Sequence, residues 1–286
     1  MKYLITGAGG QLGLELAKQL KNTEHSYQGV GHKEMDITRY DECKKVIEEY
    51  RPDVVVNCAA HTKVDLCETD IENAYRINAM GPKNLAMLSK KMDFRLVHIS
   101  TDYVFDGEKE IPRREDDKTN PVSIYGRSKL YGEEMVRQFA EKYFIIRTAW
   151  LYGDGNNFVH TMLKLSKDHK ELNVVNDQIG NPTYTKDLAL AVRNLSETEY
   201  YGTYHGTCNG SCSWNTFAKK IFELMNIHIT VNEVDSSAFV RPAKRPAFSK
   251  LDNFMLRLYD LDTFRNWEEA LEDYLKEDQE WQSINL

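Results

Sequence analysis

Apolar stretches that alternate with amphipathic helical patterns predict an α/β fold with a Rossmann-like, doubly wound parallel sheet. Two observations carry this prediction. Residues 3–6 are apolar and lead directly into a glycine-rich turn and a helical pattern. Residues 54–57, VVVN, form a continuous apolar and β-branched run, which is typical of a parallel strand covered on both faces. Apolar runs at 96–99 and 143–146 extend the alternation, with a helical pattern between them.

The composition is that of a globular protein long enough for one large domain or two smaller ones. The 286 residues carry a formal net charge of -7, and the sequence pI is about 5.7. We therefore do not expect nucleic acid as a partner. No run approaches the roughly eighteen apolar residues of a membrane span, and the chain opens on a strand rather than on a signal peptide. These features predict a cytoplasmic protein.

The turn after the first strand has glycines at the spacing GxxGxxG, namely Gly7, Gly10 and Gly13. Glycines allow a tight turn and let the backbone approach a pyrophosphate, whose charge then lies at the N-terminus of the next helix. That helix opens with Gln11 and Leu12. Because the turn lies between a strand and an amphipathic helix, it predicts a nucleotide site that these five residues contact.

The end of the second strand bears on the choice of cofactor. An acidic residue there usually binds the ribose 2′-hydroxyl of NAD. Here His32 and Lys33 follow the strand instead, which favours the 2′-phosphate of NADP; a solvated loop is the alternative. We expect NADPH, with NADH possible. Asp36 and Ile37 suit the adenine end of such a site, although Asp36 is also placed to cap the next helix.

Small side chains follow the third strand, at Ala59, Ala60 and Thr62. They would let a cofactor lie against the backbone at the end of this strand. A helix is expected at 71–89, and within it Asn78 either reaches back to main-chain groups near the strands or is an exposed polar residue.

Two further stretches carry the groups expected to do chemistry. Thr101 and Asp102 follow the strand at 96–99, so they should lie at the carboxyl end of the sheet, where open α/β folds bind ligands. Tyr125 and Lys129 lie four residues apart on a predicted helix and therefore share one face. This arrangement predicts that the Tyr125 phenol acts as an acid and that the neighbouring Lys129 ammonium shifts its pKa.

After about residue 150 the pattern indicates a smaller second region. We expect helices at 158–166 and 185–195, and one from Trp214 with Ser213 as its N-cap. We assign residues 1–150 and about 171–200 to a cofactor-binding domain, with the apolar run at 172–175 continuing its sheet. About 151–170 and 201–286 form the substrate region.

The basic segment and the cysteines are two further groups that could bind a ligand. The segment 241–246, RPAKRP, has three cations within five residues and suits a diphosphate; a solvated loop is the alternative. Five cysteines are an odd number without zinc-site spacing, so reduced thiols are expected. Cys208 and Cys212 have no second pair nearby to complete a metal site.

These motifs resemble the extended short-chain dehydrogenase/reductase superfamily, most closely the dTDP-4-dehydrorhamnose reductases of the RmlD type. The resemblance covers nearly the whole chain. Its most specific parts are STDYVFDG and NDQIGNPT. The matching segments in chain order include TGAGGQLG (6–13), RPDVVVN (51–57), AAHTKVD (59–65), STDYVFDG (100–107), YGRSKLYGE (125–133), RTAWLYG (147–153), NDQIGNPT (176–183) and RPAFSKLD (245–252).

The resemblance implies NAD(P)H-dependent reduction of the C4 ketone of dTDP-4-dehydro-6-deoxy-L-mannose to dTDP-L-rhamnose. It implies that Tyr125 gives a proton to O4, that Lys129 makes the phenolate accessible and binds the nicotinamide ribose, and that Thr101 hydrogen-bonds the carbonyl oxygen or the phenol. The nucleotide-sugar contacts that it implies, besides Thr101, are Asp102, Tyr103, Trp150, Asn157, Gln178, Arg245 and Ser249. Without it, Trp150 would be a core residue and Gln178 a turn residue.

The chain departs from the family pattern at two positions. Phe248 replaces the asparagine of RPANS, which puts one nucleotide contact in doubt. Some relatives dimerise through a magnesium ion held by carboxylates; Glu15 keeps one such position, but Lys186 stands at another. An ammonium cannot ligate Mg²⁺ and repels it. We therefore expect no metal, and either a monomer or a homodimer.

Three other functions are carried by the same fold. A different reductase or epimerase acting on a nucleotide deoxysugar would share the catalytic residues. A 4,6-dehydratase is disfavoured, because such relatives carry a carboxylate where this chain has Tyr103. A non-catalytic regulatory subunit is disfavoured by the intact Thr101, Tyr125 and Lys129.

Overall fold

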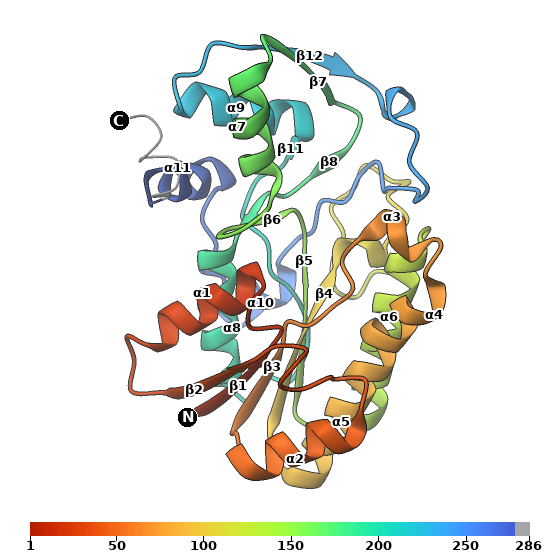
Figure 1. Ribbon diagram of the computed structural model, residues 1–286, viewed down its shortest axis with the longest axis vertical. Coiled ribbons are helices and arrows are strands. Elements are labelled where there is room, and N and C mark those ends of the chain that lie inside the picture. The colour runs from red at the N-terminus through yellow and green to blue at the C-terminus, as the bar shows by residue number, and fades with distance from the viewer. Residues whose placement is uncertain (278–286) are drawn as a thin grey trace.

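A six-stranded parallel sheet lies at the centre of the computed structural model, which describes residues 1–277 (Figure 1). The strand order is β2-β1-β3-β4-β5-β10, so the direction of winding reverses between β1 and β3. Such a reversal opens a crevice at the carboxyl ends of the strands, where open α/β sheets bind ligands. The predicted doubly wound sheet is confirmed. Its strands are β1 (Lys2–Thr6), β2 (Ser26–Val30), β3 (Val54–Asn57), β4 (Arg95–Thr101), β5 (Tyr143–Thr148) and β10 (Gly202–His205).

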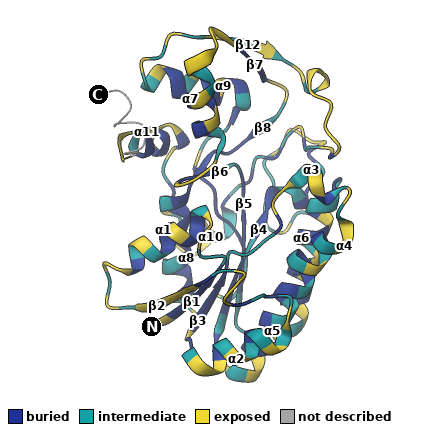
Figure 2. Cartoon of the chain, in the orientation of Figure 1, coloured by how far each residue is buried: buried dark blue, intermediate teal, exposed yellow. Residues whose placement is uncertain are grey.

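Helices cover both faces of the sheet, because successive side chains of each strand point to opposite faces. In β1, Tyr3 and Ile5 belong to one buried cluster and Leu4 to another. Figure 2 shows β1, β3, β4 and β5 buried between helices whose outer sides are exposed, while the edge strand β2 is largely exposed. One face is covered by α1 (Gln11–Leu20) and α8 (Thr185–Ser196), and the other by α2 (Tyr40–Tyr50), α5 (Gly81–Met92) and α6 (Ile124–Phe139).

The helix expected at 71–89 is interrupted by a π-helical turn. It consists of α4 (Ile71–Tyr75), the π turn η1 (Arg76–Met80) and α5, and the short α3 (Val64–Cys67) precedes it. Asn78 lies buried in the π turn. Its side chain accepts from His61 N at 2.8 Å and donates to His61 O at 3.1 Å. Asn78 therefore reaches back to the main chain after β3, and the alternative of an exposed residue is excluded.

Short strand pairs build the region above the sheet in Figure 1. The expectation that residues 172–175 continue the main sheet is wrong. Strand β7 (Glu171–Val175) pairs instead with β12 (Thr230–Val234), and the sixth strand of the main sheet is β10, from the segment assigned to the substrate region. The burial pattern gives the reason. Leu172 and Val174 are buried but Asn173 is exposed, so only one face of β7 is covered, unlike the fully buried β3.

The remaining predicted helices are confirmed. Ser213 Oγ accepts from Thr216 N at 3.0 Å, so the expected N-cap is present. The segment 241–246 is irregular, all five cysteines are free, and no helix within residues 1–277 is long and apolar enough to cross a membrane. The other elements are η2 (Asp102–Val104), β6 (Leu151–Tyr152), α7 (Phe158–Asp168), β8 (Ile179–Gly180), β9 (Thr183–Tyr184), β11 (Cys212–Ser213), α9 (Trp214–Leu224), η3 (Ser236–Ala238), α10 (Phe254–Leu258) and α11 (Trp267–Glu277).

Candidate active site

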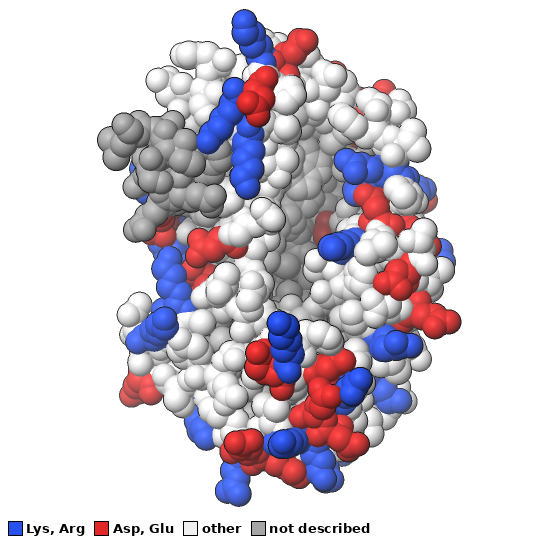
Figure 3. Space-filling model, viewed as in Figure 1, with Lys and Arg blue, Asp and Glu red and all other residues white. Residues whose placement is uncertain are grey.

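A cavity of about 880 Å³ lies at the carboxyl ends of β1, β3, β4 and β5. Figure 3 shows the hollow at the centre of this face, with charged side chains mostly around its rim. Lys33, Asn157, Gln178, Arg245 and Ser249 do not line it. The predicted residues that do line it are Gly7, Gly10, Gln11, Leu12, Gly13, His32, Asp36, Ile37, Ala59, Ala60, Thr62, Thr101, Asp102, Tyr103, Tyr125, Lys129 and Trp150.

The glycine turn leaves room that a side chain would fill. Gly7 has φ +62°, and a Cβ there would lie 2.7 Å from Ala59 N. A Cβ at Gly13 would lie 2.7 Å from Gly7 O. Gly10 is the N-cap of α1 and, within the described chain, no side chain caps this helix. Its first N–H groups are thus available to an anionic group, so the turn fits the pyrophosphate of a dinucleotide.

The structure after β2 excludes one of the two roles predicted for Asp36, that of a helix cap. Its carboxylate accepts from Thr38 N at 2.9 Å and from Thr38 Oγ1 at 2.8 Å. The N-cap of α2 is Arg39, so Asp36 does not cap that helix. His32 and Asp36 both line the cavity, and their side chains lie 3.8 Å apart. Both residues therefore line the cavity, while their roles at an adenine end stay predictions.

Helix α6 is fixed by its cap and by a buried ion pair. Ser123 Oγ accepts from Gly126 N at 3.1 Å, which starts the helix so that Tyr125 lies in its first turn. Two turns on, the buried Glu133 accepts from Ser100 Oγ at 2.6 Å and from Arg147 Nε at 2.9 Å. Burial alone would raise the pKa of Glu133, but Arg147 lowers this pKa to about 2. The pair therefore stays charged and ties α6 to β4 and β5.

Thr101, Tyr125 and Lys129 all line the cavity, as their positions predicted. Lys129 is 2% exposed, and its ammonium donates to Ile99 O at 2.5 Å. Burial lowers the pKa of Lys129 to about 8. Burial also raises the pKa of Tyr125, while a hydrogen bond with Thr101 opposes this. The shift is opposite to the one expected from a neighbouring ammonium, because the buried phenolate loses its hydration.

Asp102 contacts Thr101, and Tyr103 contacts Tyr125. The Asp102 carboxyl is 2% exposed and accepts from Thr101 Oγ1 at 2.9 Å. Burial raises the pKa of Asp102 to about 6, and hydrogen bonds from Ser249 and Thr101 oppose this. Ser249 thus lies beside Asp102 without lining the cavity. The Tyr103 ring meets the Tyr125 ring edge to face, with centroids 5.4 Å apart.

Within the basic segment, Arg245 is held by a carboxylate, while Arg241 and Lys244 are exposed. Arg245 forms two hydrogen bonds to Asp65, at 3.0 and 3.2 Å, and Arg241 lies 3.7 Å from the same carboxylate. The solvated-loop alternative is therefore excluded for Arg245. Asp65 ends the AAHTKVD motif, but the sequence alone does not indicate its role. Pairing with an arginine 180 residues away has no local signal.

Two predicted substrate residues have structural partners. Asn157 Oδ1 accepts from His160 N at 3.1 Å as the N-cap of α7. Gln178 Nε2 donates to Ser236 Oγ at 2.9 Å. Trp150 lines the cavity and stacks on Trp214, which also lines it. Sequence reasoning missed Trp214 as a cavity residue, since a tryptophan at a helix start carries no signal of its own.

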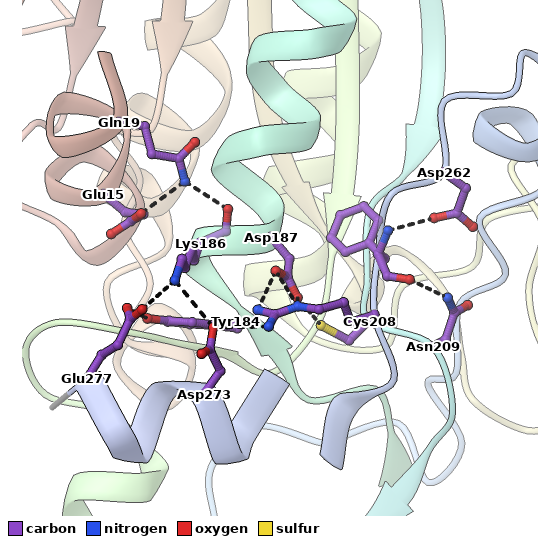
Figure 4. Close-up of polar contacts among 12 residues, drawn as sticks. Glu15, Gln19, Tyr184, Lys186, Asp187, Cys208, Asn209, Asp262, Asp273 and Glu277 are labelled. Atoms are coloured by element: carbon purple, nitrogen blue, oxygen red, sulfur yellow. Dashed lines mark hydrogen bonds and ion pairs between the residues drawn. The ribbon is translucent and has the colours of Figure 1, made fainter. Parts of the chain in front are cut away.

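The side chains near Lys186 do not fit a divalent cation. Its ammonium lies 3.3 Å from Asp273 Oδ2 and 2.5 Å from Glu277 Oε1 (Figure 4). Glu15 is held at 2.9 Å by Gln19 Nε2. No group of three or more metal-ligating side chains occurs within residues 1–277. Both carboxylates are already paired with cationic side chains, because Arg265 also donates to Asp273 Oδ2 at 3.0 Å.

Comparisons with known proteins agree with this geometry. The family model described as RmlD substrate binding domain matches residues 1–280. A dTDP-4-dehydrorhamnose reductase from Clostridium acetobutylicum ATCC 824 has a similar solved structure, with TM-score 0.95, 51% identity, and coverage of 96% of this chain and 99% of that one. A Bacillus anthracis str. Ames dTDP-4-dehydrorhamnose reductase, solved in complex with NADP, has TM-score 0.95, 44% identity and the same coverage.

A third relative has a different named substrate. A probable dTDP-4,6-dihydroxy-2-methyloxan-3-one 4-ketoreductase from Streptomyces antibioticus is 40% identical over 277 residues, covering 96% of this chain and 94% of that protein. Relatives of similar identity are thus named for the reduction of different substrates. From the match over residues 1–280 and these identities, the chain belongs to the RmlD family of dTDP-4-dehydrorhamnose reductases.

Proposed function

We propose that this chain reduces the C4 ketone of dTDP-4-dehydro-6-deoxy-L-mannose to dTDP-L-rhamnose with NADPH. One observation carries the proposal: Thr101, Tyr125 and Lys129 share a single cavity with the glycine turn. A dinucleotide held at the turn and a keto sugar held at Thr101 would therefore meet. The names of relatives at 51% and 44% identity support the choice of substrate.

The chain's own groups suit reduction. When bound, the nicotinamide supplies the hydride that is added to C4. Burial raises the pKa of Tyr125, so the phenol carries its proton at neutral pH, as a general acid for the O4 alkoxide must. Thr101 is placed to hydrogen-bond the carbonyl oxygen. The Lys129 ammonium, held by Ile99 O, stabilises the phenolate once the proton has left.

NADPH is the preferred cofactor in this proposal. His32 lies at the end of β2, lines the cavity and has a side chain that is 82% exposed, so it is accessible to a 2′-phosphate. Lys33 is its neighbour and would add a positive charge. The relative from Bacillus anthracis was solved with NADP, which supports the same choice. NADH remains the alternative that the assay distinguishes.

A second candidate is the reduction of a different dTDP-linked 4-keto sugar. The Streptomyces antibioticus relative favours it, because that 40% identical protein is named for another ketone. The same three catalytic groups would serve. The two candidates differ only in the sugar that the substrate end of the cavity accepts.

The deciding experiment is a panel of nucleotide-linked 4-keto-6-deoxysugars, each assayed with NADPH and with NADH, followed by identification of the sugar formed. We expect fastest NADPH oxidation with the dTDP-4-dehydro-6-deoxy-L-mannose substrate and dTDP-L-rhamnose as product. A faster rate on another keto sugar would support the second candidate. No oxidation with any sugar would indicate a regulatory, binding-only protein.

Three coarser expectations accompany the proposal. We propose that the main sheet and its helices hold the cofactor, while the segments above the sheet hold the sugar nucleotide. A cytoplasmic location and a monomeric or homodimeric state stay predictions. Cell fractionation and gel filtration test them.

A further inference from the structure

Two stacked indole rings form part of the cavity wall. The rings of Trp150 and Trp214 have centroids 3.5 Å apart and planes 5° apart, and both residues line the cavity. Trp150 follows β5, whose last residue Thr148 is the register partner of Thr101. The indole pair therefore lies just beyond the strand next to the reacting groups, where the sugar would bind.

Trp150 is held in an unusual conformation. Its φ is +47°, a region that a bulky residue occupies only when its surroundings require it. Trp150 O accepts from Thr183 N at 3.1 Å, which fixes the backbone. A Cβ at Gly180 would lie 2.5 Å from Trp150 Cε2, so a glycine at that position lets β8 lie against the indole.

Trp214 closes the arrangement from α9. Ser213 caps this helix and so fixes where its first residue lies. The Phe158 ring contacts Trp214 with centroids 4.5 Å apart. The Trp150 indole is thus confined between β8 and α9, two elements distant from it in sequence. Neither contact uses a residue that holds the cofactor end.

We propose that Trp214 is a positioning residue that fixes Trp150 and makes the indole pair an apolar wall specific for a 6-deoxy sugar. This rests on the proposed function. A methyl group at C6 gains from burial against indole. A hydroxyl at C6 would be buried there without a partner, which is unfavourable. The wall therefore favours deoxyhexoses over hexoses, without touching the cofactor.

The first test compares Trp214→Ala with Trp214→Phe. Loss of an aromatic pair corresponds to about a tenfold effect. We expect Trp214→Ala to raise KM for the keto sugar about tenfold, with kcat and the KM for NADPH unchanged. Trp214→Phe should recover most of the loss. Calorimetry with dTDP-L-rhamnose and dTDP-L-mannose, which differ only by the C6 hydroxyl, should show that Trp214→Ala lowers the preference for the deoxy sugar.

Gly180→Ala displaces the same indole from the other side. The added methyl group must push Trp150 away, while Trp214 itself is intact. We expect a similar rise in KM for the sugar. The stacked indoles should give an exciton couplet in the circular dichroism spectrum of the wild type. That couplet should disappear in both Trp214 variants and weaken in Gly180→Ala.

Unchanged sugar KM and unchanged sugar preference in Trp214→Ala and Gly180→Ala would overturn the proposal. Normal NADPH binding confirms that each variant is folded; if Trp214→Ala does not fold, Trp214→Phe and Gly180→Ala decide. Absence of wild-type turnover on every keto sugar would instead reject the proposed function. The dTDP-L-rhamnose and dTDP-L-mannose affinities would still test the wall in that case.

Discussion

The two ends of the cavity are built from different materials. At the glycine turn, main chain lies against main chain, as Gly7 does against Ala59. At the reacting end, side chains from distant segments hold one another, as Trp150 and Trp214 do. A substitution that adds an atom should therefore disturb the glycine turn most. A substitution that removes a side-chain group should disturb the reacting end most.

The largest effect should come from removing one group at the reacting end. Tyr125→Phe deletes the proton donor, and a general acid typically contributes about 10² to 10⁴-fold. We expect turnover to fall at least about a hundredfold in steady-state assays, while NADPH affinity, measured by fluorescence titration, is kept. Near-normal turnover would remove Tyr125 from the role.

Adding one atom at the glycine turn should give the next largest effect. Gly7→Ala forces a left-handed conformation on alanine, which costs about 1–2 kcal/mol, and its Cβ meets Ala59 N. We expect a lower melting temperature and an NADPH Kd raised at least about tenfold. Gly9→Ala is the matched control for the melting temperature, because a Cβ there meets no protein atom within 4 Å. Equal melting temperatures of the two variants would contradict the main-chain account.

The pH dependence of kcat/KM should follow the protonation of Lys129. Burial lowers the pKa of Lys129 to about 8, so its ammonium is present below pH 8 and is lost as pH rises through it. We expect kcat/KM to fall about tenfold per pH unit above this pKa. Lys129→Met should be slow and should lack this limb of the profile. A wild-type profile flat to pH 10 would contradict the assignment.

Stability should respond to the same group in the opposite direction. Between pH 8 and the ordinary lysine pKa near 10.4, the unfolded chain binds a proton that the folded chain does not. The contribution of Lys129 to the free energy of unfolding therefore rises with pH across this window. Comparing urea unfolding of the wild type with that of Lys129→Met isolates the contribution.

The smallest expected effect is none. Because the Lys186 ammonium already pairs with Asp273 and Glu277, neither EDTA nor Mg²⁺ should change activity, melting temperature or elution volume. Lys186→Glu is the informative variant, since it adds a carboxylate beside those two and Glu15. Its melting temperature should rise with Mg²⁺. A magnesium-dependent dimer of the wild type would contradict this account.

The same contrast explains what the sequence could predict. The glycine turn, the strand ends and the Tyr125–Lys129 face follow from local periodicity, and the structure shows them together. The contact of Arg245 with Asp65 joins residues far apart and leaves no local pattern. The wrong assignment of residues 172–175 to the main sheet has another cause. Such a short, mostly apolar run is compatible with a strand in any sheet. Its alternating burial appears only once its partner β12 is known.

The late position of β10 in the chain has a consequence for how the protein is made. The main sheet receives its sixth strand from residues 202–205, and α8 covers the face that buries Tyr3 and Ile5. When only the first 150 residues have emerged from the ribosome, β5 is therefore an unpaired edge strand. The hydrophobic cluster around Tyr3 and Ile5 also lacks the cover of α8. Folding from the N-terminus cannot finish until α8 and β10 have emerged. The cofactor half is thus no independent module, and a fragment ending near residue 150 should aggregate.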